Sequence, residues 1–337
     1  MKILVTGSAG FIGFHTVNKL IENGFEVVGL DNINDYYSPQ LKYARLKEAG
    51  IEQDEIRWYK LINSRKTTQY RFVRMNLEDK QQLFSLFQAE KFDYVINLAA
   101  QAGVRYSIEN PDVYVQSNIL GFHYILEACR YFPVKHLVHA SSSSVYGANA
   151  KIPFSEEDKV DAPVSLYAAT KKSNELMAHA YSQLYKVPIT CLRFFTVYGP
   201  WGRPDMAPML FAKAILDGKP INVFNNGEME RDFTYVGDIV NGVVKTTLKE
   251  FDEEPMYRVL NIGNGSPVNL MDFISEIETG IGNPALKNHM PMQPGDVPKT
   301  WASQEKLISI TNYSPKVSLK EGLSEFTTWF KNYYKTI

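Results

Sequence analysis

The N-terminal stretch up to Gly13 contains the feature that most constrains the fold. A short apolar run, Lys2–Thr6, leads directly into Gly7, Gly10 and Gly13, which have the spacing G-x-x-G-x-x-G, and apolar residues at helical spacing follow. Glycines at these places allow a tight turn, a close approach of the backbone to a pyrophosphate, and close packing of helix on sheet. The helix N-terminus then faces the phosphates. The sequence therefore predicts a strand–loop–helix unit that binds a dinucleotide.

Strand-like and helix-like patterns alternate from Lys2 to Arg193. This alternation is typical of an α/β fold with a doubly wound parallel sheet of the Rossmann type, which binds ligands at the carboxyl ends of its strands. The polar segment Ile51–Gln69 interrupts the pattern and is expected to be a surface insertion or a short hairpin. The expected strands are Lys2–Thr6, Phe25–Leu30, Tyr70–Val73, Tyr94–Leu98, His136–Ala140 and Ile189–Arg193, and the expected helices are Phe11–Asn23, Asp79–Phe87, Val113–Tyr131 and Tyr167–Tyr185.

The composition changes after Arg193. A loop rich in turn-forming and aromatic residues, Tyr198–Pro204, is followed by shorter elements. We expect a Rossmann domain over residues 1–193, to which segments near 232–263 return, and a smaller α/β substrate lobe over 194–231 and 264–337. The elements expected after the Tyr198–Pro204 loop are helices near Met209–Leu216 and Leu319–Tyr334 and strands near Ile221–Phe224 and Arg258–Ile262.

Charge and composition exclude several classes of protein. The net charge is −1 and 22% of the residues are charged, which gives no basic surface for nucleic acid and no composition typical of disorder. No apolar run approaches the roughly 18–20 residues of a membrane span, and the N-terminus lacks the pattern of a signal peptide. The histidines show no metal-ligand spacing, and Cys129 and Cys191 are expected to be buried and reduced. We expect a cytoplasmic protein with no bound metal and no nucleic-acid or membrane partner.

Asp31 favours NAD over NADP as the dinucleotide. It closes the second predicted strand, directly after the helix that follows the glycine loop. A carboxylate there accepts hydrogen bonds from both adenosine ribose hydroxyls and repels a 2′-phosphate. An amide follows the third strand, where it could meet the adenine edge, and small residues close the fourth, although ordinary packing explains either feature as well. The expected cofactor-binding residues are Gly7, Gly10, Phe11, Ile12, Gly13, Asp31, Asn32, Asn76, Leu77, Leu98, Ala99, Ala100, Asn118, Tyr167 and Lys171.

A tyrosine and a lysine four positions apart form the candidate catalytic pair. Tyr167 and Lys171 begin a predicted helix and share one face of it. A tyrosine has a pKa of about 10, and a nearby lysine cation and a positive nicotinamide would both favour the phenolate that acts as a base. Ser142, upstream of this pair, ends the fifth strand and can bridge a substrate hydroxyl and the phenol. The Tyr-x-x-x-Lys spacing often occurs by chance, so the prediction depends on its combination with Ser142 and the glycine loop.

These motifs, in this order and over almost the whole length, resemble the extended short-chain dehydrogenase/reductase family, and within it the nucleotide-sugar 4-epimerases. The resemblance implies NAD as the cofactor, a UDP-sugar as the substrate, and a homodimer in which the helices predicted at 113–131 and 167–185 form a four-helix seam. A non-enzymatic NAD-dependent sensor with this fold would need the glycine loop but not the base, so the intact Tyr167 and Lys171 favour an enzyme.

Three C-terminal segments resemble the UDP site of these epimerases. The resemblance implies that Arg231 holds the diphosphate, that Val223 and Phe224 lie beside the uracil, and that Asp296 binds the ribose. A local ion pair with its neighbour Asp232 is the alternative role for the arginine.

The segment before Asp296 departs from the pattern of the family. Many relatives place an arginine two or three residues before the final Gly-Asp, where this chain has Met292 and Gln293. The second cation on the diphosphate must then come from elsewhere, and Arg203 is the candidate.

The resemblance also implies how the reaction proceeds. Tyr167 takes the O4 proton of the sugar while C4 gives a hydride to NAD⁺. The related dehydratases carry an Asp-Glu pair directly after the catalytic serine or threonine, and UDP-glucuronate decarboxylases carry a Glu there, but this chain has Ser143 and Ser144. The remaining route is rotation of the 4-keto sugar and hydride return to its other face, which is epimerisation with no net redox change.

The stretches Asp35–Tyr37, Gln101–Ser107 and Arg193–Met206 closely resemble epimerases that interconvert UDP-glucuronate and UDP-galacturonate for polysaccharide biosynthesis. Galactose-type epimerases typically have Asn where Thr196 stands. The alternative substrates are UDP-glucose and UDP-N-acetylglucosamine, and the alternative reaction is decarboxylation to a UDP-pentose.

A C6 carboxylate would need donors in this chain. Hydroxyls of Ser143, Ser144 and Thr196 could donate to it, and Arg105 could add charge. A 4-keto uronate is a β-keto acid that readily loses CO₂, and neutral donors that hold its carboxylate would restrain that loss. The alternatives are that the serines are merely small enough to admit the nicotinamide and that Arg105 is a surface residue.

Overall fold

The computed structural model describes residues 1–149, 151–252, 254–292 and 299–335. Among these residues, no helix is both long enough and apolar enough to cross a membrane. The chain divides into two compact units, each described by itself below. Unit 1 consists of Met1–Asn149, Asp158–Phe194 and Val240–Leu260, and unit 2 consists of Ala150–Glu157, Phe195–Ile239 and Asn261–Ile337.

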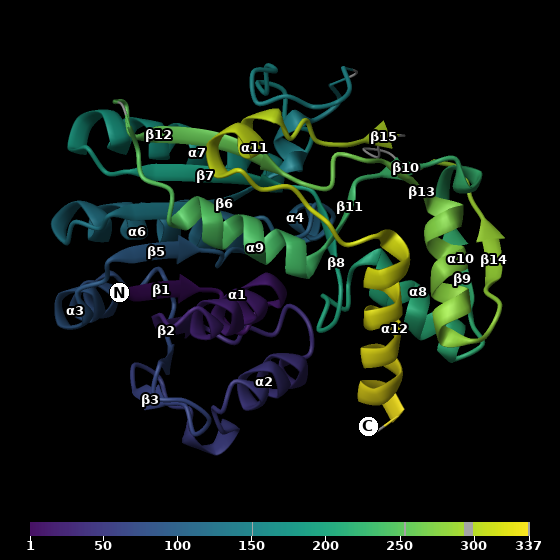
Figure 1. Cartoon of the computed structure of the whole chain (residues 1–337), viewed down its shortest axis with the longest axis horizontal. Coiled ribbons are helices and arrows are strands. Elements are labelled where there is room, and N and C mark those ends of the chain that lie inside the picture. The colour runs from purple at the N-terminus through teal and green to yellow at the C-terminus, as the bar shows by residue number, and fades with distance from the viewer. Residues whose placement is uncertain (150, 253, 293–298, 336–337) are drawn as a thin grey trace. The chain divides into compact units, whose positions relative to one another are not determined.

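An eight-stranded sheet forms the centre of unit 1 (Figure 1). Its strands are β1 (Lys2–Thr6), β2 (Glu26–Asp31), β3 (Leu61–Asn63), β4 (Tyr70–Arg74), β5 (Tyr94–Asn97), β6 (His136–Ser142), β7 (Ile189–Phe194) and β12 (Tyr257–Ile262). Their order is β12-β7-β6-β5-β1-β2-β4-β3, and the pairs from β7 to β4 are parallel. β1 pairs with β2 on one side and with β5 on the other, so the winding reverses there. Such a reversal is where a doubly wound sheet binds its ligand.

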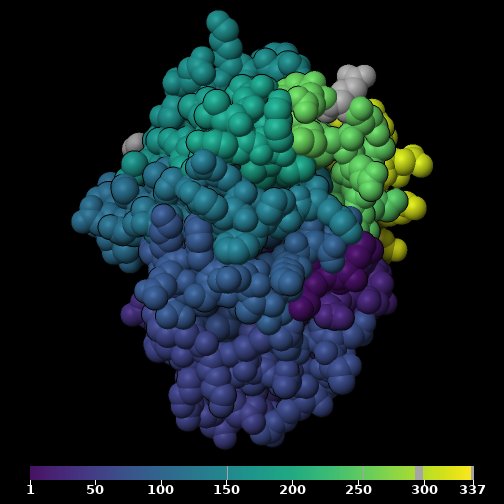
Figure 2. All heavy atoms as spheres, turned by 90° about the vertical axis from the view of Figure 1, so that its left-hand side faces the viewer, coloured from purple at the N-terminus to yellow at the C-terminus, as the bar shows by residue number. Residues whose placement is uncertain are grey.

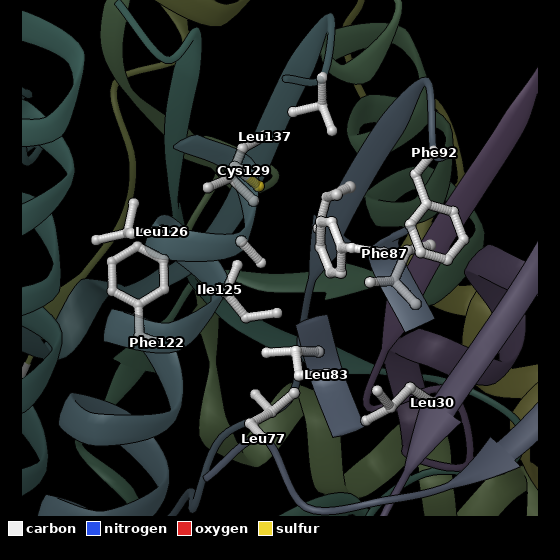
Figure 3. Close-up of a cluster of buried hydrophobic side chains, with 14 of the residues drawn as sticks. Leu30, Leu77, Leu83, Phe87, Phe92, Phe122, Ile125, Leu126, Cys129 and Leu137 are labelled. Atoms are coloured by element: carbon white, nitrogen blue, oxygen red, sulfur yellow. The ribbon is translucent and has the colours of Figure 1, made fainter. Parts of the chain in front are cut away.

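Each strand predicted between Lys2 and Arg193 is present, and helices pack against the sheet. Leu83 and Phe87 of one helix and Phe122 and Ile125 of another lie in the same buried cluster as residues of the sheet (Figure 3). Because helices cover the sheet, its strands are buried on both faces and their sequences are nearly continuous apolar runs. The longer helices of unit 1 are α1 (Phe11–Glu22), α2 (Pro39–Glu48), α3 (Lys80–Glu90), α6 (Gly121–Tyr131) and α7 (Leu166–Tyr185).

The single helix predicted over 113–131 is interrupted. The short α5 (Asp112–Tyr114) leads into a π-helical turn, η2 (Val115–Leu120), before α6 begins. A π-turn widens the helix locally and changes which side chains face inward. Here it accompanies the burial of Asn118, which is 2% exposed.

The segment Ile51–Gln69 forms a short 3-10 helix, η1 (Gln53–Glu55), and the strand β3, which pairs antiparallel with β4. The hairpin predicted there is therefore present. Trp58 is 42% exposed, and the guanidinium of Arg74 lies 4.4 Å from the centre of its ring. The violet-blue atoms of this part of the chain lie on the surface in Figure 2.

Unit 2 is built around its own apolar core, in which Phe233 and Phe273 stack with ring centres 3.9 Å apart. Its helices are α8 (Ala207–Leu216), α10 (Leu270–Ile281), α11 (Glu305–Thr311) and α12 (Leu319–Lys335), and α9 (Val236–Thr247) begins in unit 2 and ends in unit 1. In two of its small sheets, β8 (Thr196–Tyr198) pairs with β11 (Phe233–Tyr235), and β9 (Pro220–Val223) pairs with β14 (Leu286–His289). In a third, β10 (Glu230–Arg231) lies between β13 (Val268–Asn269) and β15 (Lys299–Thr300).

The compact units differ from the predicted domain boundaries at two places. Residues 150–157 were expected in the Rossmann domain but belong to unit 2, where Phe154 donates its backbone N–H to the carbonyl of Trp301 at 2.9 Å. Of the returning segment expected near 232–263, only Val240–Leu260 belongs to unit 1. The preceding residues stay in unit 2 because β11 pairs with β8.

Candidate active site

The loop between β1 and α1 has the geometry that a pyrophosphate cradle needs. Gly7 has a φ of +69°, and a Cβ on it would lie 2.8 Å from the backbone N of Ala99. A Cβ on Gly13 would lie 2.0 Å from the carbonyl oxygen of Gly7. Gly10 caps α1 without a side chain, and no acidic residue lies in the first turn of that helix. The positive end of α1 can therefore face an anion, and side chains at these glycines would block the loop.

Asp31 lies at the end of β2 and is 6% exposed. Its carboxylate accepts the backbone N–H of Ala9 at 3.1 Å and that of Ile33 at 2.8 Å, so it holds the glycine loop and the following turn together. Each carboxylate oxygen has two acceptor sites, which leaves capacity for ribose hydroxyls. The carboxylate, as an acceptor, thus fits the ribose hydroxyls in the adenosine half of a dinucleotide. The next residue, Asn32, accepts the backbone N–H of Asn34 with its side-chain oxygen at 3.1 Å.

Two buried cations on α2 support this loop and the turn after β2, and sequence reasoning missed both. Arg45 is 0% exposed and donates from Nη1 to the carbonyl of Ala9 at 2.9 Å and to the phenol of Tyr37 at 2.8 Å. Lys42 donates from Nζ to the side-chain oxygen of Asn34 at 2.6 Å. Because α2 carries charged residues on its buried face, no apolar period reveals it.

The remaining predicted cofactor residues lie in the first turn of α1 and at or near the ends of β4 and β5. Thr6 accepts the backbone N–H of Ala99 at 3.1 Å and donates to Asn97 at 2.6 Å, which fixes the segment that continues through Ala100. Phe11 and Leu77 are buried, whereas Ile12, Asn76 and Leu98 are half-buried. Their contact with a cofactor stays a prediction.

Asn118 uses its side chain within the protein. Its Oδ1 accepts the backbone N–H of Gln101 at 2.8 Å, and its Nδ2 donates to the carbonyl of Gln101 and to Thr170 Oγ1, both at 3.0 Å. These bonds tie the chain after β5 to the helix that carries Tyr167. These bonds do not test the predicted contact of Asn118 with the cofactor, which stays a prediction.

Tyr167 and Lys171 lie in the first two turns of α7, which begins at the N-cap Ser165. Nζ of Lys171 lies 6.0 Å from the centre of the Tyr167 ring and donates to the carbonyl of Ala140 in β6 at 2.7 Å. Burial lowers the pKa of Lys171 to about 8, so the amine remains mostly cationic at neutral pH. A cation at this distance favours the phenolate form of a tyrosine.

The predicted catalytic serine is the last residue of β6. Ser142 Oγ accepts the backbone N–H of Ser144 at 3.2 Å and the hydroxyl of Ser144 at 2.8 Å, and the short helix η3 (Ser143–Tyr146) follows. All three serines, 142–144, are half-buried. The structure therefore brings the serine run and Lys171 to the same end of β6, through Ala140.

His139 precedes this end of β6 and is a core histidine. It is 1% exposed, stacks on Phe122 with ring centres 3.9 Å apart, and bonds to the amide of Asn97 at 3.0 Å. Burial and the nearby charge of Lys171 hold its pKa well below the ordinary value. The ring is therefore neutral at physiological pH.

The predicted substrate residues fall into both units. In unit 1, Arg105 is exposed and directly precedes the short helix α4 (Tyr106–Glu109). In unit 2, Val223 is fully buried, whereas the neighbouring Phe224, Thr196 on β8 and Arg231 on β10 are half-buried. Asp296 lies outside the described residues.

The two predicted phosphate-binding arginines of unit 2 have partners of their own. Arg203 donates from Nε and Nη2 to the carboxylate of Asp205, at 3.1 and 2.5 Å. Arg231 donates to the carbonyl of its neighbour Glu230 at 3.0 Å. The adjacent Asp232 is buried and accepts from Thr234 and from the backbone N–H groups of Asn264, Gly265 and Ala302, so it fixes the strand that carries Arg231.

Comparison with known proteins shows the family. Residues 3–263 match the NAD-dependent epimerase/dehydratase family. The chain belongs to this family. The extended short-chain dehydrogenase/reductase resemblance is thereby confirmed.

Relatives within the epimerase/dehydratase family align over the full length. A probable UDP-glucuronate 4-epimerase of Rhizobium meliloti is 45% identical, over 99% of this chain and 98% of the relative. Protein CapI of Staphylococcus aureus is 50% identical over 99% of this chain and 100% of the relative. The solved UDP-glucuronic acid 4-epimerase from Bacillus cereus, in complex with UDP-glucuronic acid and NAD, has a TM-score of 0.88 and 35% identity, covering 99% of this chain and 100% of that one.

The lowered pKa of Lys171 predicts a specific pH dependence of stability. The test compares two NAD-free proteins: the Tyr167→Phe variant, which keeps Lys171, and the double variant Tyr167→Phe, Lys171→Met. Because burial disfavours the cation, the folded protein with Lys171 binds fewer protons than its unfolded chain between pH 8 and 10.5. Its free energy of unfolding relative to the Met variant should therefore rise by about 2 kcal/mol from pH 7.5 to 9.5, measured by urea unfolding. A difference that stays flat or falls would contradict the assignment of a buried amine.

Proposed function

We propose that this chain is an NAD-dependent 4-epimerase that interconverts UDP-glucuronate and UDP-galacturonate. The observation that carries the proposal is the buried Lys171 ammonium, bonded to the carbonyl of Ala140 and 6.0 Å from the centre of the Tyr167 ring. This arrangement suits a phenolate base at the end of β6, beside the serine run. The choice of substrate rests on the full-length similarity to UDP-glucuronate 4-epimerases.

The residues of this chain divide the work of the reaction. The glycine loop and Asp31 hold NAD, which when bound supplies the reversible oxidation of C4. Tyr167 removes the O4 proton as the alcohol becomes a ketone and returns it when the opposite face of C4 is reduced. Lys171 stabilises the phenolate, and Ser142 donates to O4 and orients it. The sugar is oxidised and reduced once each, so the two products differ only in the configuration at C4.

The groups after Ser142 favour epimerisation over elimination. Removal of water or CO₂ needs an acid or a base near C5 and C6, and the two positions that supply such groups in relatives hold Ser143 and Ser144. Neutral hydroxyls can bind a carboxylate without exchanging protons with the sugar carbons. We assign Ser143 and Ser144, together with Thr196, to the C6 carboxylate, and Arg105 as an additional charge.

The UDP group is assigned to residues of unit 2. Arg231 and Arg203 are proposed to neutralise the diphosphate, which requires Arg203 to exchange its carboxylate partner Asp205 for phosphate oxygens. Val223 and Phe224 are proposed to lie beside the uracil, and Asp296 to bind the ribose.

A homodimer in the cytoplasm that serves polysaccharide biosynthesis completes the proposal. Large apolar side chains are exposed on the two helices of the expected seam: Leu176 is 60% and Leu184 70% exposed on α7, and Tyr131 at the end of α6 is 58% exposed. The two leucines lie eight positions apart on one side of α7. Burying this surface against a second copy would remove it from water.

Incubation with separate UDP-sugars tests the proposed reaction. UDP-glucuronate should yield UDP-galacturonate without added reductant, and Tyr167→Phe should lower the turnover at least about 100-fold while the protein keeps its NAD, because the base is lost but the cofactor loop is not. Tyr94→Phe, at the opposite end of the sheet, should stay close to the parent rate. Turnover of UDP-glucose or UDP-N-acetylglucosamine but not of the uronate would refute the substrate, and a UDP-pentose product would refute the reaction.

The dimer proposal has its own test. The double variant Leu176→Glu, Leu184→Glu should sediment as a monomer at micromolar concentration, because charges replace the apolar contacts of the seam. Leu286→Glu, at a comparably exposed position of unit 2, should remain dimeric. A parent protein that is itself monomeric would exclude the seam.

A further inference from the structure

A buried ion pair lies directly behind the catalytic end of the sheet. Glu175 and Arg193 are 1% and 2% exposed. Arg193 donates from Nε to one carboxylate oxygen of Glu175 at 2.8 Å and from Nη2 to the other at 2.9 Å. Glu175 is on α7 one turn after Lys171, and Arg193 is on β7, so the pair joins the catalytic helix to the sheet.

The ion pair holds both ends of the serine turn, 141–146. At its start, the hydroxyl of Ser141 donates to Glu175 Oε1 at 2.7 Å, and Ser141 is also the register partner of Arg193 between β6 and β7. At its end, the guanidinium of Arg193 lies 4.8 Å from the centre of the Tyr146 ring. Ser142, Ser143 and Ser144 lie between these two anchors. A shift of the ion pair would therefore move all three hydroxyls.

The same pair limits the movement of α7. The phenol of Tyr257 donates to the backbone carbonyl of Glu175 at 3.0 Å, which ties the helix to β12 as well. Lys171 binds the carbonyl of Ala140, and Glu175 binds the hydroxyl of the next residue, Ser141. Side chains from two successive turns of α7 thus form hydrogen bonds with two successive residues of β6, immediately before Ser142.

Stability alone gives a weak reason for such a group. Removing a carboxylate and a guanidinium from water is costly for each ion, and apolar side chains of similar volume often stabilise a fold as well or better. What a fork-shaped, bidentate pair adds is a fixed geometry. Catalysis needs that geometry, because a misplacement of about 1 Å can lower a rate on the order of 100-fold.

We propose that Glu175 and Arg193 are positioning residues that fix the serine run against Lys171 and Tyr167. The inference rests on the proposed epimerase reaction. Both side chains are buried within the protein, so their role is assigned to positioning and not to contact with the sugar. They act through Ser141 and Tyr146 on one side and through the backbone of α7 on the other, so they should affect the rate of the chemical step more than the binding of substrate or cofactor.

Two variants perturb the pair by different amounts. Glu175→Gln keeps the shape of the side chain but places an amide N–H₂ opposite a guanidinium N–H, and should lower kcat about 10-fold or more with a KM within about twofold. Ser141→Ala removes one hydrogen bond while leaving the ion pair intact, and should lower kcat about threefold or more. Both should retain as much NAD as the parent.

Two controls separate positioning from a loss of stability. Glu90→Gln disrupts the part-buried carboxylate that pairs with Arg71 and Lys2 at the other side of unit 1, and should lower the melting temperature without lowering kcat. Ser182→Ala removes a hydroxyl that is 1% exposed on α7 itself, about two turns beyond Glu175, and should leave kcat unchanged.

The outcomes distinguish this inference from the proposed function. A parent protein that does not turn over UDP-glucuronate refutes the function. If the parent is active, kcat values within twofold of it for both Glu175→Gln and Ser141→Ala overturn the positioning role. An equal loss of kcat in Glu90→Gln also overturns it, because the effect would then follow general stability. If Glu175→Gln does not fold, Ser141→Ala against Ser182→Ala decides the question.

Discussion

The buried ammonium of Lys171 is the interaction on which the rest of the site depends. A cation enclosed by protein loses its hydration, and here the loss is partly offset by one short bond to the carbonyl of Ala140. That bond fixes the amine to the strand that ends in Ser142 and leaves its charge near the Tyr167 ring. The chain thus keeps a costly charge where a phenolate would benefit from it.

The sheet supplies the frame for this interaction. The strand order reverses at β1, so the loops after β1 and β5 lead away in opposite directions. The glycine loop approaches the backbone of Ala99 so closely that only glycine fits at position 7. Asp31 and Arg45 then hold Ala9 of that loop from its N–H and its carbonyl, respectively. Parallel topology brings these loops to the edge where β6 ends in the serine run.

The sequence predicts the parts of this arrangement that depend on local pattern. The six strands expected before Phe194, the glycine loop, the place of Asp31 and the pairing of Tyr167 with Lys171 on one helix all follow from spacing and apolar period. The π-turn at Val115–Leu120 has no such signal, because its residues also read as α-helix.

Contacts between distant residues are harder to predict. The α2 helix buries charged residues, and their burial depends on hydrogen bonds to other parts of the fold. The segment Ala150–Glu157 belongs to unit 2 because it bonds to the chain near Trp301, which is remote in the sequence. In the sequence, Glu175 and Arg193 have no feature that distinguishes them from surface charges, and only the fold brings them together as a buried ion pair. In each case the deciding partner lies in another element of the fold, and the local apolar pattern of a single sequence does not reveal it.

The central claim is that the surroundings of Tyr167 favour its phenolate. The most direct measurement is an ultraviolet absorbance titration of tyrosinate in the NAD-loaded protein, taken as the difference between the parent and Tyr167→Phe. We predict a midpoint at least about one pH unit below the ordinary tyrosine pKa of about 10, and a higher midpoint in Lys171→Met. A midpoint at or above 10 in the parent protein would contradict the account.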